Sequence, residues 1–170
     1  MTRKRWITTK ELIIFAMLGT IIFLSDLLME ALPNIHGVAM FITLFTLLYR
    51  WKALIPIYVY VLLNGLYAGF ALWWVPYLYI WTILWALILI IPKSARDKTR
   101  FILCVVFCSL HGLLFGILYA PLQAIMFGLD FKGMITWIVA GFPFDILHLI
   151  GNFAVSFLII PLYKSLKKFI

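Results

Sequence analysis

The sequence predicts an all-α integral membrane protein, folded as a compact bundle of six transmembrane helices with cytoplasmic N- and C-termini. Three observations lead to this class. Hydrophobic residues make up 66% of the 170 positions and the mean hydropathy is +1.12, whereas soluble domains are roughly 45–50% apolar. The uncharged runs are long enough to cross a hydrocarbon core about 30 Å thick. The Lys and Arg residues stand in short clusters between these runs. A water-soluble fold is therefore excluded.

The uncharged runs define the spans, because a helix needs about 20 mostly apolar residues to cross the core. The longest run covers 40 residues, 53–92, and contains Gly65, Gly69 and Pro76 near its middle, so we expect two helices joined by a turn. The second predicted span is short, which leaves a tilted, bent or partly re-entrant segment open. The six spans form a single domain and lie at about 11–31, 36–49, 53–70, 75–92, 101–128 and 134–163.

The positions of the basic residues predict the orientation. Thirteen of the fourteen Lys and Arg residues precede the first span, follow the sixth, or lie in the connections after the second and fourth. Only Lys132 lies in a connection on the other face. Because short cytoplasmic loops are enriched in Lys and Arg, this alternation predicts cytoplasmic termini. The net charge of +8 then reflects topology and contact with anionic lipid, and no nucleic-acid partner is expected. We also expect no cleavable signal peptide, since the first apolar run is better interpreted as the first span.

Several kinds of chemistry are not indicated by the sequence. It contains no phosphate-binding loop, no zinc-protease helix and no nucleophile elbow, so we expect neither ATP hydrolysis nor an enzyme. No cofactor or metal is expected, because Cys104 and Cys108 are better interpreted as packing or lipid-facing thiols than as a metal pair. Charged residues within the spans are few, which disfavours a carrier driven by protons or sodium without excluding it.

Polar and aromatic residues gather at the predicted outer ends of the first four spans. Asp26 and Glu30 are one helical turn apart, which is also compatible with a solvated helix end. The aromatic residues of the connection after the third span are interpreted either as a belt at the headgroup level or as a stacking wall for a flat heterocycle. The candidate substrate-binding residues of this region are Asp26, Glu30, Asn34, His36, Asn64, Tyr67, Trp73, Trp74 and Tyr77.

Polar side chains also interrupt the last two spans. Gln123 is predicted to lie nearer the outer face than His111, while Asp145 and His148 are spaced to share one helical face. A carboxylate at bilayer depth costs a few kcal/mol unless it is paired, so Asp145 should face the bundle interior. Three roles stay open for Asp145: a structural pair with His148 or with His111, direct ligand contact, and a proton relay. Gln123, Asp145 and His148 complete the candidate substrate-binding residues.

Features spread over the whole chain resemble one known family. They are the compact six-helix size, a basic N-terminus running into TKEL at 9–12, aromatic outer loops, and a closing stretch AGFPFDILHLIGNF at 140–153 followed by Pro161 and Leu162. In these respects the chain is similar to the S components, the membrane-embedded substrate-binding subunits, of energy-coupling factor (ECF) vitamin transporters. The resemblance implies a multi-pass protein of a prokaryotic plasma membrane. It also implies an ABC-type importer in which the chain works with a transmembrane coupling subunit and two ATPase subunits.

The resemblance further implies where this chain would meet its partners. S components dock through small residues on the first helix, typically Ala-x-x-x-Ala, and the corresponding residues here are Ala16, Gly19 and Thr20. The second alanine of the pattern is thus absent, and Thr20 stands in its place. The ligand pocket of the family lies at the outer end of the bundle, between the first loop and the outer halves of the third to sixth spans.

The residues of that outer end suggest a class of ligand. An aromatic wall suits a flat heterocycle, and Asp26 or Glu30 suits a neutral or cationic molecule. Thiamin or a precursor, stacked on Trp73 or Trp74 with cation–π contact, is the first expectation, and riboflavin is the second. Two other classes stay open. One is a solitary secondary carrier with Asp145 as its coupling carboxylate, and the other, less favoured, is a small membrane enzyme that uses Asp145, His111 and His148.

Overall fold

The structure is a computed structural model that describes residues 6–32 and 35–169, and in these residues every regular element is a helix. The α-helices are α1 (Thr9–Leu28), α2 (Val38–Tyr49), α3 (Leu54–Ala68), α4 (Tyr77–Leu89), α5 (Asp97–Leu113), α6 (Phe115–Phe127), α7 (Phe131–Ser156) and α8 (Ile159–Leu166). Five helical stretches are long and apolar enough to cross a membrane: Thr9–Leu28, Val38–Ala68, Leu72–Leu89, Asp97–Phe127 and Phe131–Ser156. The prediction of an all-helical chain is confirmed, and these stretches fit a multi-pass membrane protein.

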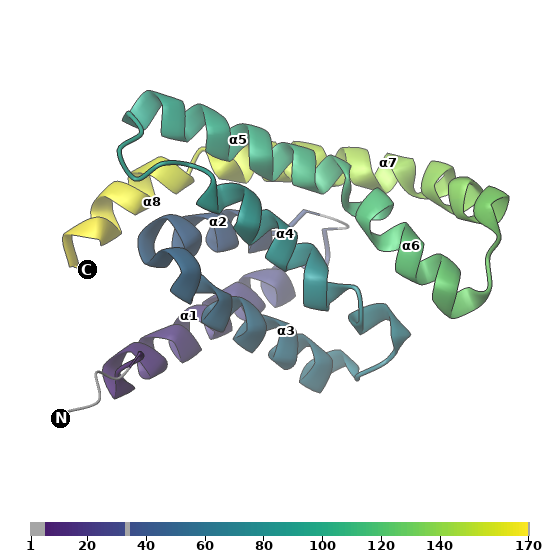
Figure 1. Cartoon of the computed structure of the whole chain (residues 1–170), viewed down its shortest axis with the longest axis horizontal. Helices are drawn as coiled ribbons and strands as arrows, with labels where there is room; N and C mark the ends of the chain where they lie inside the picture. The colour runs from purple at the N-terminus through teal and green to yellow at the C-terminus, as the bar shows by residue number, and fades with distance from the viewer. Residues whose placement is uncertain (1–5, 33–34, 170) are drawn as a thin grey trace.

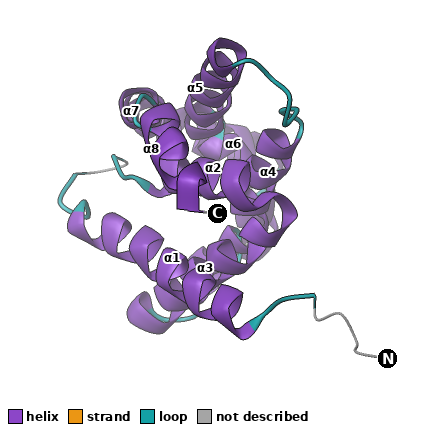
Figure 2. Cartoon of the chain, turned by 90° about the vertical axis from the view of Figure 1, so that its left-hand side faces the viewer, coloured by secondary structure: helices purple, strands orange, loops and turns teal. Residues whose placement is uncertain are grey.

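The helices lie in three layers. In Figure 1, α5 and α7 run side by side in one layer, α1 and α3 cross in the opposite layer, and α2 and α4 lie between them. Figure 2 shows the same separation from the side. The middle layer holds the core: Ile42, Leu44 and Phe45 of α2 are at most 2% exposed. Helix α2 is apolar on all sides, which is the pattern of a helix surrounded by others.

Only a narrow stripe of residues on α1 packs against the other helices. Its buried residues are Phe15, Gly19 and Ile22, and the side chains between them are mostly exposed. At Gly19, an added Cβ would lie 2.5 Å from Val59 Cγ1 and 2.8 Å from the carbonyl oxygen of Pro56. Only glycine therefore allows α1 and α3 to approach this closely, as small residues commonly do between membrane helices. The outward side of α1 is left to face lipid.

The predicted spans 36–49 and 53–70 form one helical stretch with a sharp turn at Arg50. A 3₁₀-helix, Arg50–Ala53, joins α2 to α3, and Arg50 has a φ of 55°. The Arg50 guanidinium donates hydrogen bonds to the carbonyl oxygens of Ile91, at 3.1 Å, and Leu89, at 2.6 Å. These two carbonyls lie at the end of α4, where the helix leaves acceptors without a partner. Arg50 therefore ties the turn to α4.

Replacing Arg50 with alanine should lower the free energy of unfolding by about 2–4 kcal/mol, because two charge-assisted hydrogen bonds to the end of α4 are lost. Thermal unfolding in detergent measures the effect. Lys52→Ala is the control, since Lys52 pairs with Glu11 at a partly exposed site and such pairs contribute about 0–1 kcal/mol. Equal losses for the two variants would contradict this role for Arg50.

Two other predicted spans are divided in the structure. The span predicted at 101–128 consists of α5 and α6, which meet at Leu114 with φ −93° and ψ 2°. The span predicted at 134–163 ends at Ser156, and α8 follows as a separate short helix after Phe157 and Leu158. Leu114 is an ordinary apolar residue, whereas Pro161 follows the second break and lacks the N–H that a continuous helix would donate to the Phe157 carbonyl. The break at Leu114 exposes the first backbone N–H groups of α6 within a membrane-spanning stretch, and these need acceptors.

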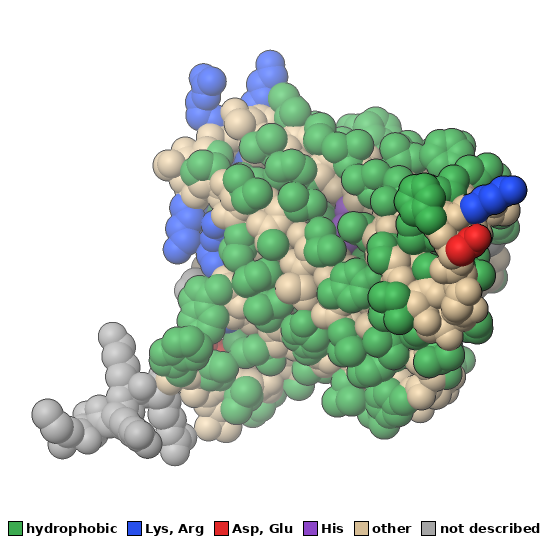
Figure 3. All heavy atoms as spheres, turned by 45° about the vertical axis from the view of Figure 1, so that its right-hand side comes forward, with side chains coloured by type: hydrophobic (Ala, Val, Ile, Leu, Met, Phe, Trp, Pro, Cys, Tyr) green, Lys and Arg blue, Asp and Glu red, His purple; other side chains and the backbone are tan. Residues whose placement is uncertain are grey.

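The basic residues gather at one end of the molecule. Figure 3 shows Lys and Arg side chains on the side where both chain ends lie, and an acidic and a basic side chain together at the far end. Ion pairs connect this basic end: Lys52 with Glu11, and Lys164 with Asp97 at 2.8 Å. Basic clusters that are distant in sequence therefore meet in space. The aromatic connection between α3 and α4 lies at the opposite end.

Candidate functional site

Eight of the twelve candidate substrate-binding residues line two cavities that share Trp73. One, called the acidic cavity here, has a volume of about 270 Å³ and is lined by Phe23, Asp26, Leu27, Glu30, Asn64, Tyr67, Ala68 and Trp73. The other, the α6–α7 cavity, has a volume of about 480 Å³ and is lined by Trp73, Phe115, Gly116, Tyr119, Gln123, Phe127, Trp137, Gly141, Phe144, Asp145 and His148. The sequence had suggested a single pocket for these residues.

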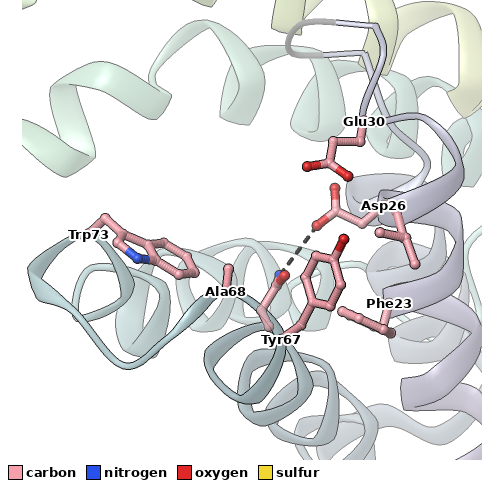
Figure 4. Close-up of a pocket in the computed structure, with 8 residues that line it drawn as sticks. Phe23, Asp26, Glu30, Tyr67, Ala68 and Trp73 are labelled. Atoms are coloured by element: carbon pink, nitrogen blue, oxygen red, sulfur yellow. Dashed lines mark hydrogen bonds between the residues drawn. The ribbon is translucent and has the colours of Figure 1, made fainter.

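The acidic cavity is built where the last turns of α1 meet those of α3. Phe23 and Asp26 share the face of α1 that turns toward α3, and Glu30 lies in the turn just after α1 ends at Leu28. Tyr67 comes from the last turn of α3, and Trp73 from the short 3₁₀-helix Leu72–Trp74 that follows it. Figure 4 shows the two carboxylates close together, facing the space that the rings of Tyr67 and Trp73 border.

The carboxylate of Asp26 is held in place by two donors. The Tyr60 hydroxyl donates to Asp26 Oδ2 at 2.9 Å, and the Asn64 amide donates to the same oxygen at 3.3 Å. Tyr60 is 1% exposed, so its hydroxyl would be costly to leave without an acceptor. The two hydrogen bonds fix the direction of the carboxylate while Asp26 still lines the cavity. Tyr60 thus orients Asp26, a role that sequence reasoning did not anticipate.

The charge of the acidic cavity has one sign. Its lining contains two carboxylates and three aromatic rings, and neither Lys nor Arg. Two neighbouring carboxylates repel each other unless a cation or a proton lies between them. The faces of aromatic rings attract cations as well. The cavity is therefore suited chemically to a small organic cation, or to a neutral molecule that presents hydrogen-bond donors.

The α6–α7 cavity follows the seam between two antiparallel helices. Tyr119 and Gln123 lie along the same side of α6, and Trp137 and Gly141 lie along the facing side of α7. The Tyr119 and Trp137 rings stack with centroids 5.7 Å apart and an interplanar angle of 18°. The cavity is mainly aromatic, and its deep end holds the carboxylate of Asp145 and the ring of His148.

Asp145 closes the start of α6. Its Oδ1 accepts a hydrogen bond from the backbone N–H of Gly116 at 3.0 Å, which satisfies one of the groups exposed by the break at Leu114. A carboxylate is favoured at this position because the N-terminus of a helix carries a partial positive charge. A pair with His148 or His111 was one of the three roles that the sequence left open for Asp145, and the hydrogen bond of Asp145 Oδ1 in the described residues goes to Gly116 instead. Asp145 is 5% exposed, as predicted for an interior carboxylate.

The three histidines of the chain form a single cluster. His36 Nε2 lies 2.8 Å from His148 Nε2, and His111 Nε2 lies 3.0 Å from the carbonyl oxygen of Ile80. The Trp81 ring packs against His36 and His111, with centroids 6.2 and 5.5 Å away. His36 is not among the residues that line either cavity. It ties the connection before α2 to α7, while His148 also contributes to the α6–α7 cavity.

We expect low pH to weaken the contact between His36 and His148. Burial lowers the pKa of His36 below its ordinary value of 6.5, and the nearby charge of Asp26 acts in the opposite direction. The unfolded chain then binds more protons than the folded chain as the pH falls below about 6.5, so stability is lost with falling pH. We expect the unfolding midpoint to drop between about pH 6.5 and pH 5, and to drop less in His36→Gln. Equal pH dependence in the two proteins would contradict the assignment.

Two other candidate residues, Trp74 and Tyr77, lie outside both cavities. Trp74 donates from Nε1 to the carbonyl oxygen of Val61 at 2.7 Å, and Tyr77 packs edge-on against Trp73 and Trp81. Neither side chain lines one of the two cavities, because both point into the packing between helices. Asn34 lies outside the described residues.

The remaining sequence-based interpretations concern the cysteines and the docking residues. Cys104 and Cys108 are fully buried in the core, and the described residues contain no group of three or more His, Cys, Asp or Glu suited to a metal ion. Of the docking residues, Ala16 and Thr20 are exposed on the outward side of α1. Gly19 is buried against α3 and is used for packing within the chain.

Sequence reasoning missed some residues of the cavities. Phe23 and Trp137 line the acidic and the α6–α7 cavity, and Gly116 anchors Asp145. A signal existed for the two aromatic residues, since Phe23 is three positions before Asp26 and Trp137 eight before Asp145, both on the same helical face. None existed for Gly116, because its partner is 29 positions away.

Comparisons with protein-family models, with curated proteins and with solved structures found no match for this chain.

Proposed function

We propose that this chain is a substrate-binding membrane subunit that captures a small cationic or neutral heteroaromatic molecule, in the manner of a vitamin-binding S component of an ECF-type importer. The observation that carries the proposal is the acidic cavity: two carboxylates facing three aromatic rings, with no Lys or Arg in its lining. This combination offers charge pairing, stacking and cation–π contact to one ligand at once. A separate ATPase module would then drive delivery.

The size and charge of the cavity favour thiamin or a precursor over riboflavin. Its volume of about 270 Å³ is just below the usual range for ligand pockets, which begins at about 300 Å³. Thiamin carries a permanent positive charge on a small ring, and that charge would lie between the carboxylates of Asp26 and Glu30 with the ring against Trp73. Asn64 would contact the polar substituents of the second ring. Riboflavin is larger and neutral, so it would gain less from the two carboxylates.

The distribution of Lys and Arg favours an orientation that fits the same proposal. With the basic end in the cytoplasm, as the distribution of Lys and Arg favours, the acidic cavity would open at the outer side of the membrane. The coupling subunit would dock on the outward side of α1, where Ala16 and Thr20 are exposed and a small side chain allows close approach. Docking would not use Gly19, which is occupied by α3.

A ligand screen tests the proposal directly. The purified chain in detergent is heated with thiamin, thiamin precursors, riboflavin and other B vitamins, and any ligand that co-purifies is identified by mass spectrometry. Saturable stabilisation by one cationic heterocycle is expected, since a ligand at 100 times its Kd adds about 2.7 kcal/mol to the folded state. Absence of a response to every member of the panel, with a lipid or isoprenoid co-purifying instead, would overturn it.

A variant of α1 tests docking separately from binding. Ala16→Trp should abolish uptake in cells that supply the coupling subunit and the ATPases, and leave ligand binding by the purified chain unchanged. Ile21→Trp is the control, because Ile21 is 40% exposed but lies about 140° around the helix from Ala16. Loss of binding in Ala16→Trp would show that Ala16 packs the bundle. Uptake without the ATPase subunits would favour a solitary carrier.

A further inference from the structure

We propose that the α6–α7 cavity is a second binding site, distinct from the acidic cavity, and that it takes a lipophilic amine: an elongated apolar molecule with a primary ammonium group at one end. The ammonium group would pair with Asp145 at the deep end, and the apolar body would lie between the aromatic side chains of the seam. This proposal concerns a different cavity and a different ligand from the function proposed above, and it does not depend on that function.

The cavity has the shape of a groove. Its lining residues on α6 extend from Gly116 to Phe127, and those on α7 extend from Trp137 to His148. Each of these two intervals covers eleven residues of rise, or about 16 Å of helix. The two helices run antiparallel (Figure 1), with Gly116 beside Asp145 and the Tyr119 ring stacked on that of Trp137. A cavity of about 480 Å³ along such a seam fits a slim, extended ligand.

One buried atom at the deep end lacks a partner. Asp145 is 5% exposed; its Oδ1 accepts from Gly116, but its Oδ2 has no hydrogen-bond partner in the described residues. A buried carboxylate oxygen without a partner is costly, and native proteins usually satisfy such atoms with protein, water or a ligand. The cavity lining contains neither Lys nor Arg that could pair with it. A ligand that donates from a positively charged group is therefore the best complement.

The rest of the lining selects an apolar body and an entry from the membrane. Six aromatic side chains, among them Trp73, Tyr119 and Trp137, border the cavity. At its margin, Phe127 is 58% and Phe144 is 54% exposed, and exposed apolar side chains on membrane-spanning helices face lipid. A molecule dissolved in the bilayer can thus reach the groove. The ring of Trp73 borders the acidic cavity on its other side, so the two cavities share a wall and hold separate ligands.

The test uses the full chain in nanodiscs of phosphatidylcholine, with dodecylamine as the probe and dodecan-1-ol as its neutral analogue of equal length. Tryptophan fluorescence reports occupancy, because Trp73 and Trp137 line the cavity, and native mass spectrometry counts bound molecules. We expect a one-to-one adduct with the amine, which binds about ten- to hundredfold more tightly than the alcohol. Equal responses to the two probes, as partition into the bilayer alone would produce, would overturn the proposal.

Two variants test the charge of Asp145 and the open space of the α6–α7 cavity separately. Asp145→Asn retains an oxygen that accepts from Gly116, so the fold is kept, and it should erase the preference for the amine over the alcohol. Gly141→Phe adds a ring where nothing lies within 4 Å of an added Cβ, and it should block both probes while Asp145 stays intact. Asp97→Asn removes the same charge at the basic end and should change neither. Tight amine binding in Asp145→Asn or in Gly141→Phe would overturn the assignment, whatever the outcome of the vitamin screen.

Discussion

Replacing Asp26 with asparagine should weaken binding of a thiamin-like cation about tenfold to a hundredfold, the largest effect we expect on ligand binding. The substitution keeps the size of the side chain and an oxygen that accepts from Tyr60 and Asn64, but it removes one of the two negative charges of the acidic cavity. A charge-assisted contact in a partly buried site contributes about 1.5–3 kcal/mol, which corresponds to that range of affinity. Titration calorimetry on the detergent-purified chain measures the change.

The controls for Asp26→Asn lie in the same chain. Asp97→Asn removes an equal charge at the basic end, where Asp97 pairs with Arg100 and Lys164, and it should leave affinity unchanged. Tyr60→Phe should give an intermediate loss, because the carboxylate loses one of the two donors that orient it. If Asp26→Asn and Asp97→Asn bind the ligand equally well, the acidic cavity is not the capture site.

Replacing Gly116 with alanine should lower the free energy of unfolding by about 2–3 kcal/mol, a loss comparable to that expected for Arg50→Ala. An added Cβ at Gly116 would overlap Asp145 Oδ2, and the carboxylate cannot move away without giving up its hydrogen bond to the Gly116 N–H. Overpacking of a well-packed interior costs about 1–3 kcal/mol, and loss of the hydrogen bond adds to it. For a chain of this size the loss lowers the unfolding midpoint by about 4–12 °C, which a thermal unfolding scan in detergent detects.

Gly141→Ala is the matched control for Gly116→Ala. Both glycines lie in helices and line the α6–α7 cavity, but an added Cβ at Gly141 meets nothing within 4 Å. Alanine should therefore be neutral there, or stabilising by about 0.5–1 kcal/mol, because it restricts the unfolded chain and favours the helix. A Gly116→Ala protein as stable as the Gly141→Ala protein would mean that Asp145 does not cap α6 in the membrane.

Composition and local spacing determine the class of this protein and much of its candidate site. Long apolar runs indicate membrane helices, because a helix satisfies its own backbone in hydrocarbon and needs about 20 apolar residues, whereas a strand of a membrane β-barrel needs only about 9–11. The spacing of Asp26 and Glu30 predicts that the two carboxylates lie close together, and the structure has them in one cavity, although Glu30 lies in the turn after α1. The interior position of Asp145 was likewise predictable from the cost of an exposed carboxylate in lipid.

Only the tertiary structure decided how these residues are grouped. The single pocket expected at the aromatic end is two cavities, because Trp73 stands between α1 and α3 on one side and α6 and α7 on the other. Gly19 was expected on a docking face and packs against α3 instead. The break between α5 and α6 at Leu114 leaves the Gly116 N–H to be satisfied by the carboxylate of Asp145, 29 positions later in the sequence. Such contacts join residues that are far apart in sequence, and helical periodicity relates only residues a few turns apart.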